Sequence, residues 1–447
     1  MKKSFLKTAL LMASIISIVS CSKESSAPKE FSADNYKTVK QLRNTDNLEF
    51  NVKESVLQEK GYQEFASKMR VFSNKLTEVV SKEQYNQAKN FTFSPLSIEL
   101  CLGLAVRSTA GTTRQEILDA FDMDYETFNK YYKAFFENKY FRYTKGNTDI
   151  VESMMIPTNS IWVDDNAVLK DDCLDALKND YLCNSFEVDF GPKGNKSTMK
   201  AMHDFVYEKT NELLDVKFDL DPSTVFVLMN TVYLKDAWSC DDGKYYTTDA
   251  YKFTNANGVQ SNKPLLASSY CTGKVMETDD YSAFYVYTNK GRMYFVKPAE
   301  GKSIKDVFTK EAIANVTNRD NYVSYDRDQN IKYETSTIFP KFEASSDFSL
   351  MAILGRHFNI NSLFQTSCDF SSITDMDVVA SDIVHVAKLI TNENGIEAAA
   401  LTYIPVAMSA APSYTLVQEQ FVIDKEFGYI YTSDDDVVFA GTVTNID

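Results

Sequence analysis

The stretch from Thr391 to Pro412, TNENGIEAAALTYIPVAMSAAP, constrains the fold of this chain more than any other. Its Ala-rich centre favours a helix, but the β-branched and aromatic residues that follow favour a strand. Pro405 is incompatible with a helix interior. Every second residue from Ile396 to Met408 is uncharged, whereas the alternate face begins with Glu397. This period of two predicts a segment that can form a strand with one buried face, although its small residues also suit an exposed loop.

The length and charge of the chain narrow the class of protein. With 447 residues it can bury a large core, and the length allows one large domain or two to three smaller ones. A hydrophobic content of 44% is typical of a globular protein. The net charge of −15, without any basic run, argues against nucleic acid as a partner.

The first 21 residues, MKKSFLKTALLMASIISIVSC, combine a basic start, an apolar centre and small residues before Cys21. This pattern predicts an export signal that is too short for a membrane-spanning helix. The residues Ile18 to Cys21 resemble a bacterial lipobox. We therefore expect a signal peptide over 1–20, a lipidated Cys21 that begins a flexible polar tether over 21–47, and one folded domain over 48–447.

The expected location is the bacterial outer membrane, to which the exported chain is attached by lipid, with the periplasmic or surface face left open. The alternative is an ordinary signal peptide that contains a cysteine. Export permits disulfides, but the remaining cysteines are widely spaced and several lie in apolar contexts. We expect no essential disulfide framework among them. They are Cys101, Cys173, Cys183, Cys240, Cys271 and Cys368.

Helices and strands alternate along the rest of the chain. Apolar spacing predicts an amphipathic helix over Tyr62–Val80. A second, buried helix is expected to begin with Ser94 as cap and Pro95 in its first turn, and to end at Gly111. The run from Thr224 to Leu234 is nearly all apolar and predicts a strand buried on both faces.

The sequence contains no recognisable catalytic motif, so we do not expect an enzyme. The chain has no GxSxG, HExxH, P-loop or GxGxxG motif in a suitable context. Three histidines make a His-rich metal site implausible. A Ser-His-Asp triad stays open in principle, since its members need not be neighbours, but no serine lies in a nucleophile context. We expect no catalytic residue, no metal and no cofactor.

Several motifs occur in the order found in the serpins, a family of suicide inhibitors of proteases, and the resemblance extends over about residues 48–447. It implies an α+β fold: a single domain with large, mostly antiparallel sheets, surrounding helices and an exposed reactive loop. The motifs that carry it are N-x-x-x-S-P-x-S-I at 90–98, N-T-V-Y-L-K-x-x-W at 230–238, F-P-K-F at 339–342, E-N-G-I-E-A-A-A at 393–400 and the tail at 421–443.

The same resemblance implies roles for the stretch from Thr391 to Pro412. A protease cuts such a loop about fourteen residues after the hinge glycine, which places the reactive bond at Ser409-Ala410, with Met408-Ser409 as the alternative. The freed segment then inserts into the central sheet. By resemblance, the hinge consists of Glu393, Gly395, Ile396, Glu397, Ala398, Ala399 and Ala400.

Small residues around this bond favour elastase-like or subtilisin-like serine proteases as partners. A papain-like cysteine protease is the alternative, because the trap requires a covalent acyl intermediate. Pro405 cannot donate a ladder hydrogen bond, and we expect it to weaken insertion without preventing it. The resemblance implies a monomer that inhibits proteases. The alternatives are a non-inhibitory serpin that is cleaved as a substrate, and a surface lipoprotein that binds glycan or peptide.

Two further groups of residues take roles from the resemblance. Ser94, Ser97, Asn230 and His385 correspond to the shutter beneath the place where the loop strand enters the sheet. Trp238 corresponds to the breach, where insertion begins. Without the resemblance, His385 reads as an ordinary core histidine with one hydrogen bond, and Trp238 as an ordinary core residue.

Overall fold

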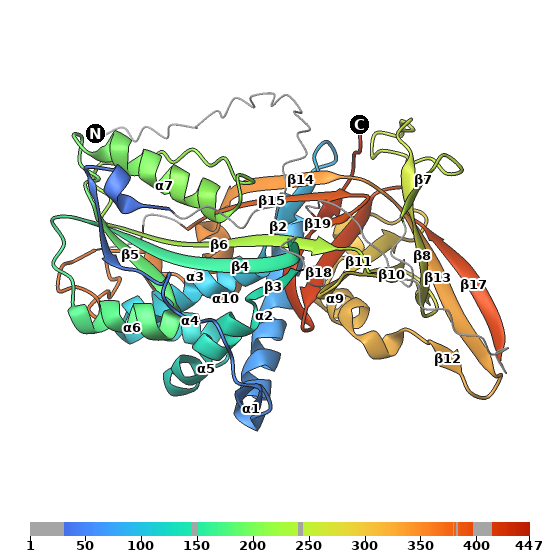
Figure 1. Ribbon diagram of the computed structural model, residues 1–447, viewed down its shortest axis with the longest axis horizontal. Coiled ribbons are helices and arrows are strands. Elements are labelled where there is room, and N and C mark those ends of the chain that lie inside the picture. Colours follow the sequence, from blue (N-terminus) through green and yellow to red (C-terminus); the bar gives the residue numbers. More distant parts are fainter. Residues whose placement is uncertain (1–30, 145–150, 240–244, 379, 381–382, 397–413) are drawn as a thin grey trace.

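The computed structural model describes residues 31–144, 151–239, 245–378, 380, 383–396 and 414–447. The strands in this part of the chain form three sheets of eight, six and five strands, with helices packed around them (Figure 1). Nearly all of the strand pairs are antiparallel. The predicted α+β fold with mostly antiparallel sheets is therefore confirmed.

The eight-stranded sheet runs through the middle of the molecule (Figure 1). Only its β4–β5 pair is parallel. In spatial order its strands are β1 (Val39–Arg43), β5 (Cys183–Val188), β4 (Val151–Asp164), β6 (Phe226–Ala237), β16 (Gly395–Ile396), β15 (Val384–Asn392) and β14 (Glu343–Ser349), with β3 (Phe141–Thr144) beside β4.

The strand predicted over Thr224–Leu234 is β6, but its predicted burial on both faces is wrong for one half. Residues 231–236 are buried, whereas residues 226–230 are only half-buried. The reason lies in the sheet, because the half-buried part of β6 borders a cavity between β6 and β15.

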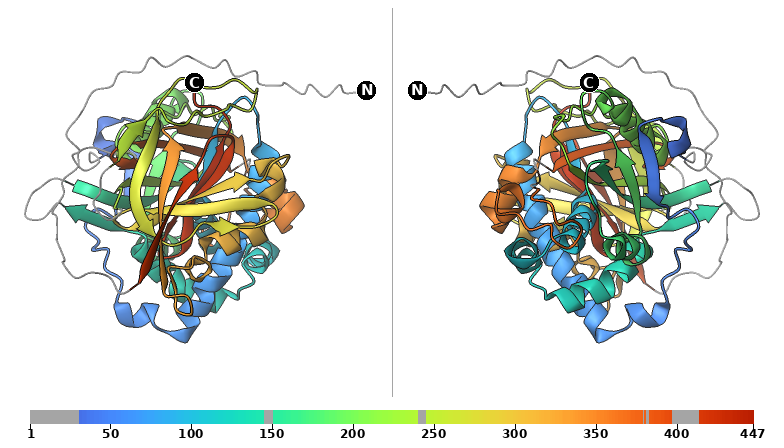
Figure 2. Two further views of the ribbon diagram at one scale, coloured as in Figure 1. Left: turned by 90° about the vertical axis from the view of Figure 1, so that its right-hand side faces the viewer. Right: turned by 90° about the vertical axis from the view of Figure 1, so that its left-hand side faces the viewer.

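Two smaller sheets lie toward the right-hand side of the molecule in Figure 1, and the left view of Figure 2 looks onto that side. The six-stranded sheet contains β2 (Phe91–Phe93), β19 (Asp436–Val443), β18 (Phe427–Ser433), β11 (Gly291–Pro298), β10 (Tyr281–Tyr287) and β9 (Met276–Glu277). The five-stranded sheet contains β12 (Tyr325–Asp326), β13 (Ile331–Pro340), β8 (Leu265–Thr272) and β7 (Tyr246–Thr248), with β17 (Thr415–Val422) parallel to β13.

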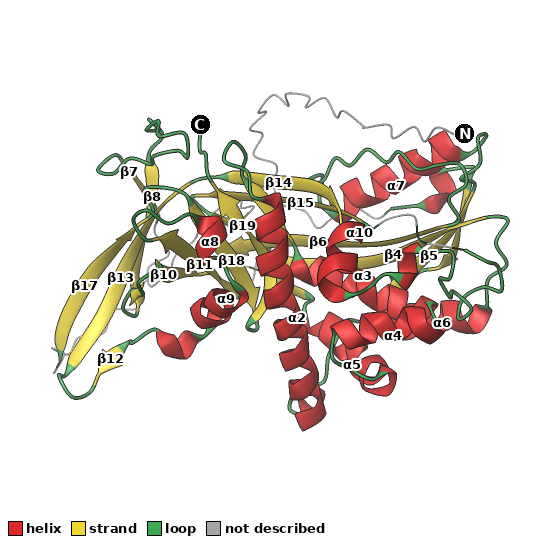
Figure 3. Cartoon of the chain, turned by 180° about the vertical axis from the view of Figure 1, so that it is seen from behind, coloured by secondary structure: helices red, strands yellow, loops and turns green. Residues whose placement is uncertain are grey.

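The helices cover both faces of the eight-stranded sheet. α7 lies on one face and the cluster from α3 to α6 lies on the other (Figures 1 and 3). No described helix is both long and apolar enough to cross a bilayer. The helices are α1 (Glu54–Leu57), α2 (Lys60–Gln84), α3 (Pro95–Ser108), α4 (Gly111–Ala120), α5 (Tyr125–Asn138), α6 (Asp171–Tyr181), α7 (Asn195–Lys209), α8 (Ile304–Val307), α9 (Lys310–Thr317) and α10 (Met351–Phe358), with 3-10 turns η1 (Ala33–Asn35), η2 (Arg319–Asn321) and η3 (Ser362–Phe364).

The predicted helix over Tyr62–Val80 is α2, which is longer at both ends. α3 begins as predicted: the Ser94 hydroxyl oxygen accepts a hydrogen bond from the Ser97 N–H at 3.1 Å, and Pro95 is the first helical residue. The predicted end at Gly111 is wrong, because α3 stops at Ser108 and Gly111 begins α4. The φ of +52° at Gly111 is one that glycine tolerates, and it makes the turn between the two helices.

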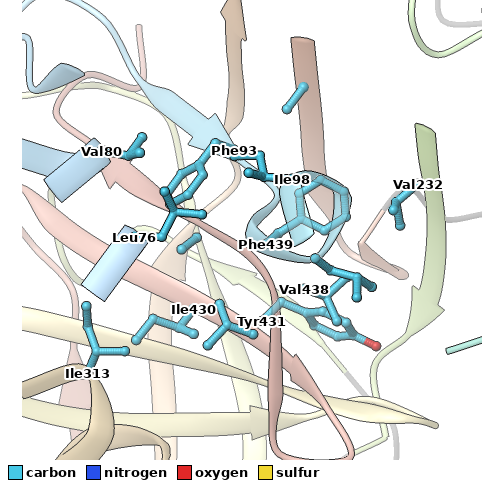
Figure 4. Close-up of a cluster of buried hydrophobic side chains, with 14 of the residues drawn as sticks. Leu76, Val80, Phe93, Ile98, Val232, Ile313, Ile430, Tyr431, Val438 and Phe439 are labelled. Carbon is cyan, nitrogen blue, oxygen red and sulfur yellow. The ribbon is translucent and has the colours of Figure 1, made fainter. Parts of the chain in front are cut away.

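The largest hydrophobic core among the described residues joins the three sheets and most of the helices. Figure 4 shows the part of it where side chains of α2, α3 and α9 meet those of β2, β6, β18 and β19. Large aromatic residues such as Phe93, Tyr431 and Phe439 fill this region, so the strands of the six-stranded sheet are fixed against the helices beneath the main sheet.

The second half of the expected flexible tether is packed against the domain. β1 pairs with β5 at the edge of the main sheet, and Phe31 lies among the rings of Trp162, Phe186 and Phe205 at 5.3–6.1 Å. Arg43 forms ion pairs with two aspartates of α6. The polar composition predicted a tether, but this segment contains one buried aromatic residue, Phe31. It also contains a strand, β1, that pairs with the open edge of the main sheet.

The cysteines differ in part from the expectation. Cys271 is disulfide-bonded, so a disulfide is present where we expected no essential framework. Cys101, Cys173 and Cys183 are buried free thiols, and Cys368 is a half-buried one. Burial raises the pKa of Cys101 to about 12, which keeps this thiol protonated and unreactive.

Candidate functional site: the gap between β6 and β15

β6 and β15 are neighbours in the main sheet that are held apart rather than paired. The two residues of β16 lie between them: Ile396 pairs with Asp236 of β6 and with Thr391 of β15. Beyond Ile396, the described residues of β6 and β15 share no ladder pair with each other. The sheet is therefore split along most of the length of these two strands.

A cavity of about 190 Å³ lies in this gap. Ser97 and Cys101 of α3 line one side, and residues 228–231 of β6 and His385 of β15 line the edges. Leu214 and residues 216–220, from the segment that connects α7 to β6, line the outer side. The described residues thus surround the cavity with the edges of β6 and β15 as walls and with α3 on the core side.

The hinge residues Gly395 and Ile396 form β16 itself. Gly395 has a φ of +147°, and a Cβ atom at this position would lie 2.3 Å from the backbone oxygen of Asp236. Only glycine allows this close approach to β6. Ile396 is 1% exposed, so the first side chain after the glycine already faces the core between the two strands.

The turn between β15 and β16 is held by an ion pair. The Glu393 carboxylate accepts a hydrogen bond from the Lys341 ammonium at 2.6 Å, and this contact holds the pKa of Glu393 below its usual value. Both side chains are about 40% exposed, so the pair orients the turn and contributes little free energy.

Trp238, the predicted breach residue, fastens the same turn. Its indole N–H donates to the Asn392 backbone oxygen at 2.8 Å, and its backbone N–H donates to the Asn394 oxygen at 3.2 Å. The ring is 5% exposed and packs against Tyr245 and Phe339. The structure therefore brings Trp238 into direct contact with the hinge.

Asp236 is a residue of this site that the sequence motif left unassigned. Its backbone pairs with Ile396, and its buried carboxylate accepts a hydrogen bond from the Tyr431 hydroxyl at 2.8 Å. Burial raises the pKa of Asp236. An aspartate at the end of a mostly apolar strand, directly before Ala237 and Trp238, was the signal for a buried polar contact beside the hinge.

The predicted shutter residues Ser94 and His385 are in direct contact. The imidazole Nε2 of His385 accepts a hydrogen bond from the Ser94 backbone N–H at 3.1 Å, so a neutral ring carries its proton on Nδ1. The Ser94 hydroxyl donates to the Val438 oxygen at 2.7 Å. Burial lowers the pKa of His385 to about 3, and the ring is neutral at physiological pH.

The other two predicted shutter residues continue this network across the gap. The Ser97 hydroxyl donates to the Asn230 backbone oxygen at 3.2 Å. The Asn230 side chain turns away from His385 and donates to the Asn159 amide oxygen at 2.9 Å. Asn159 in turn donates to the Tyr132 hydroxyl at 3.0 Å. Asn159 and Tyr132 were not predicted, although an asparagine within an apolar strand is a signal for a buried polar network.

This network is structural rather than nucleophilic. The Ser94 hydroxyl caps α3 and the Ser97 hydroxyl is engaged with β6, so neither is free to attack a substrate. Within the described ranges, no group of three His, Cys, Asp or Glu side chains is placed to hold a metal ion. The arrangement can hold the edges of a split sheet in place, and its short polar contacts can form again after the strands move.

The remaining predicted site residues lie outside the described part of the chain. They are the hinge residues Glu397, Ala398, Ala399 and Ala400, the residues Met408, Ser409 and Ala410 around the expected reactive bond, and Cys21.

Comparison with known proteins identifies the class to which this fold and site belong. A family model described as Serpin (serine protease inhibitor) matches residues 67–446. Alpha-1-antiproteinase of Rattus norvegicus is 25% identical over 349 residues, which cover 75% of this chain and 80% of that protein. An uncharacterized serpin-like protein of Thermococcus kodakarensis is 27% identical over 383 residues, which cover 83% of this chain and 84% of that protein.

The solved structures agree. Serpin48 of the insect Tenebrio molitor has a TM-score of 0.69 at 22% identity, and the match covers 86% of this chain and 99% of that structure. The chain belongs to the serpin family, which comprises protease inhibitors and not enzymes. Family membership removes the alternative of an unrelated lipoprotein that binds glycan or peptide.

Proposed function

We propose that this chain is an inhibitory serpin that traps a serine protease by inserting its cleaved loop between β6 and β15. The observation that carries the proposal is the position of β16. Its two residues already pair with both strands, and the next ladder positions of β6 and β15 lie along the gap.

The register of β16 predicts how the inserted strand would pair. Continued along both ladders, it places Ala400 between Val232 and Ala387, which are buried apolar residues. In this inserted state the uncharged face that begins with Ile396 would meet the core along the gap. The alternate face, which carries Glu397, would meet the outer side of the sheet.

The same register would place Thr402 between Asn230 and His385. Asn230 is paired in turn with Asn159, so four polar residues would form one row across the sheet. The Asn230 amide oxygen is buried and has no hydrogen-bond partner within the described ranges. The Thr402 hydroxyl would donate to it, which supports an inserted state in which the shutter network is more complete than before insertion.

Insertion releases free energy because it creates backbone and core contacts together. Each ladder hydrogen bond contributes roughly 0.5–1.5 kcal/mol net, and apolar burial adds about 25 cal/mol per Å². Over about fourteen residues these contributions reach the order of tens of kcal/mol. The intact chain is held from this state kinetically until the loop is cut.

The proposed target is an elastase-like or subtilisin-like serine protease that cleaves Ser409-Ala410. Small residues flank this bond, which suits a shallow specificity pocket. A papain-like cysteine protease is the alternative, since it also forms an acyl intermediate. Met408-Ser409 is the alternative bond.

We also propose that Cys21 is lipidated and attaches the monomeric chain to a bacterial outer membrane. The lipobox-like residues before Cys21 support this anchor. Mass spectrometry of the membrane-extracted protein tests it: the expected result is a diacylglyceryl adduct on Cys21. A free Cys21 inside a longer, unmodified chain would contradict it.

The inhibitory function is tested by incubation with pancreatic elastase or subtilisin, followed by a denaturing gel and mass spectrometry. A covalent complex heavier than the free chain, with a released peptide that begins at Ala410, is the expected result. Cleavage at the same bond without a complex would identify a non-inhibitory substrate. A chain that stays intact with both proteases would contradict the proposed target class.

A further inference from the structure

One arm of the five-stranded sheet extends beyond the rest of the molecule. β12, β13 and β17 form this arm at the right-hand end of Figure 1. Two ladders define its register: Tyr325 of β12 pairs with Lys332 of β13, and Lys332 pairs with Leu416 of β17. Residues that pair directly have their side chains on the same face, so these three form a row across the arm.

The face that carries this row is exposed and partly apolar. Tyr325 and Leu416 are each 43% exposed. Tyr414 lies two residues before Leu416, and its ring contacts that of Tyr325 at 6.4 Å, while the Lys332 ammonium lies 5.7 Å from the Tyr414 ring.

Polar contacts border these apolar groups. Lys332 pairs with the Glu334 carboxylate at 2.7 Å, and Gln418 donates to Glu334 at 3.3 Å. We define the arm face by these six residues: Tyr325, Lys332, Glu334, Tyr414, Leu416 and Gln418. Two tyrosines and a leucine with a polar border have the composition of a protein-binding surface.

The covalent chain limits the distance between the arm face and the proposed reactive bond. Tyr414 follows Ala410 by four residues, and four residues span at most about 14 Å. A protease domain of about 230 residues has a radius of gyration of about 17 Å. A protease whose active site encloses Ser409-Ala410 therefore reaches the arm face on the carboxyl side of the bond.

We propose that the arm face is a second docking surface for the target protease, and that it binds apolar side chains beside the part of the cleft that holds residues after the cut bond. This inference rests on the proposed function. The loop supplies the bond to be cut, and Tyr325, Tyr414 and Leu416 supply contacts that the loop sequence alone does not contain.

The test measures the second-order rate of reaction with elastase or subtilisin for the full chain and four variants, of which one is a control. We expect Tyr325→Ala and Leu416→Ala each to lower the rate by about five- to tenfold. Tyr325→Phe keeps the ring and loses the hydroxyl contact with Asn330, so we expect it to retain the rate within about twofold. A synthetic peptide of residues 401–413 lacks the arm face, and its cleavage rate gives the reference for the loop sequence alone.

Val168→Ala is the matched control. Val168 is 78% exposed and lies just before α6 in the sequence, and α6 is at the opposite end of the molecule from the arm (Figure 1). We expect its rate to equal that of the unmodified chain, and thermal melting of all variants checks that the fold is unchanged.

Rates that are equal for Tyr325→Ala, Leu416→Ala and Val168→Ala would overturn the docking surface while leaving the proposed function intact. If the unmodified chain is cleaved without a covalent complex, the inhibitory function fails, but the cleavage rates still report on the arm face. A concentration-dependent dimer in sedimentation, abolished by Leu416→Ala, would assign the arm face to a second copy of the chain and also overturn the proposal.

Discussion

The Nε2 atom of His385 lies 3.1 Å from the backbone nitrogen of Ser94, and this contact joins β15 to the first turn of α3. The acceptor must be a neutral imidazole, because a protonated ring has no lone pair on Nε2. Burial keeps the ring neutral by lowering the pKa of His385 to about 3. One edge of the split sheet is therefore fastened by a group whose protonation would break the contact.

We predict that His385 makes the fold sensitive to acid. The pKa is about 3 in the folded chain and about 6.5 in an unfolded one, so the unfolded state binds more protons between these values. The contribution of His385 to the free energy of unfolding is therefore fully present above about pH 6.5. It falls as the pH drops toward about 3, by up to about 1.4 kcal/mol per pH unit. The check is the thermal midpoint of the chain and of His385→Gln at pH 7.5, 6 and 5. The glutamine can accept the same hydrogen bond without titrating, so its midpoint should fall less; equal decreases would contradict the role of His385.

A matched pair of loop variants tests the register of insertion. We predict that Ala400→Glu converts the inhibitor into a substrate, because the carboxylate would be buried between Val232 and Ala387. Ala399→Glu would face the outer side beside Lys388 and should still form the complex. The measurement is the stoichiometry of inhibition with elastase. Equal behaviour of the two variants would show that the strand does not enter in this register.

The two tryptophans of the chain offer a probe and its control. Trp238 is hydrogen-bonded to the hinge turn, whereas Trp162 is fully buried among Phe31, Phe186 and Phe205. We predict that cleavage of the loop shifts the emission of Trp162→Phe, in which only Trp238 reports. The emission of Trp238→Phe should stay constant. A change confined to Trp162 would place the rearrangement away from the hinge.

The packed amino-terminal segment gives a prediction about stability. Phe31 is 8% exposed and contacts four aromatic rings. Phe31→Ala should lower the free energy of unfolding by roughly 2–4 kcal/mol, measured as a lower thermal midpoint. Lys40→Ala serves as the control, because its ion pair with Glu187 is largely exposed and worth little. Equal midpoints for Phe31→Ala and the unmodified chain would mean that the segment adds nothing to the fold.

The parts of the fold that could be predicted are those set by neighbouring residues in the sequence, such as the start of a helix. The Ser94-Pro95 pair marks the start of α3 correctly, since capping depends on neighbouring residues alone. Gly111 was misread as the end of α3, because a glycine with positive φ serves equally to begin the next helix after a tight turn. The tether was misread beyond residue 30, since the pairing of β1 depends on a sheet edge formed about 140 residues later.

The site was predictable as a set of residues but not as a geometry. Ser94, Ser97, Asn230 and His385 do come together, yet the Asn230 side chain turns toward Asn159 instead of His385. That choice depends on the neighbouring strand β4, which no local pattern reveals. The half-buried part of β6 has the same origin, because the gap beside it is a property of the whole sheet.

The most direct test of loop insertion compares thermal melting before and after a single cut in the loop. The intact chain and the chain nicked at Ser409-Ala410 are measured under identical conditions. If the freed segment inserts between β6 and β15, the added ladder and core contacts should raise the midpoint by on the order of 20 °C. Superimposable curves would contradict the central claim, since they would show that no free energy is stored in the uncut loop.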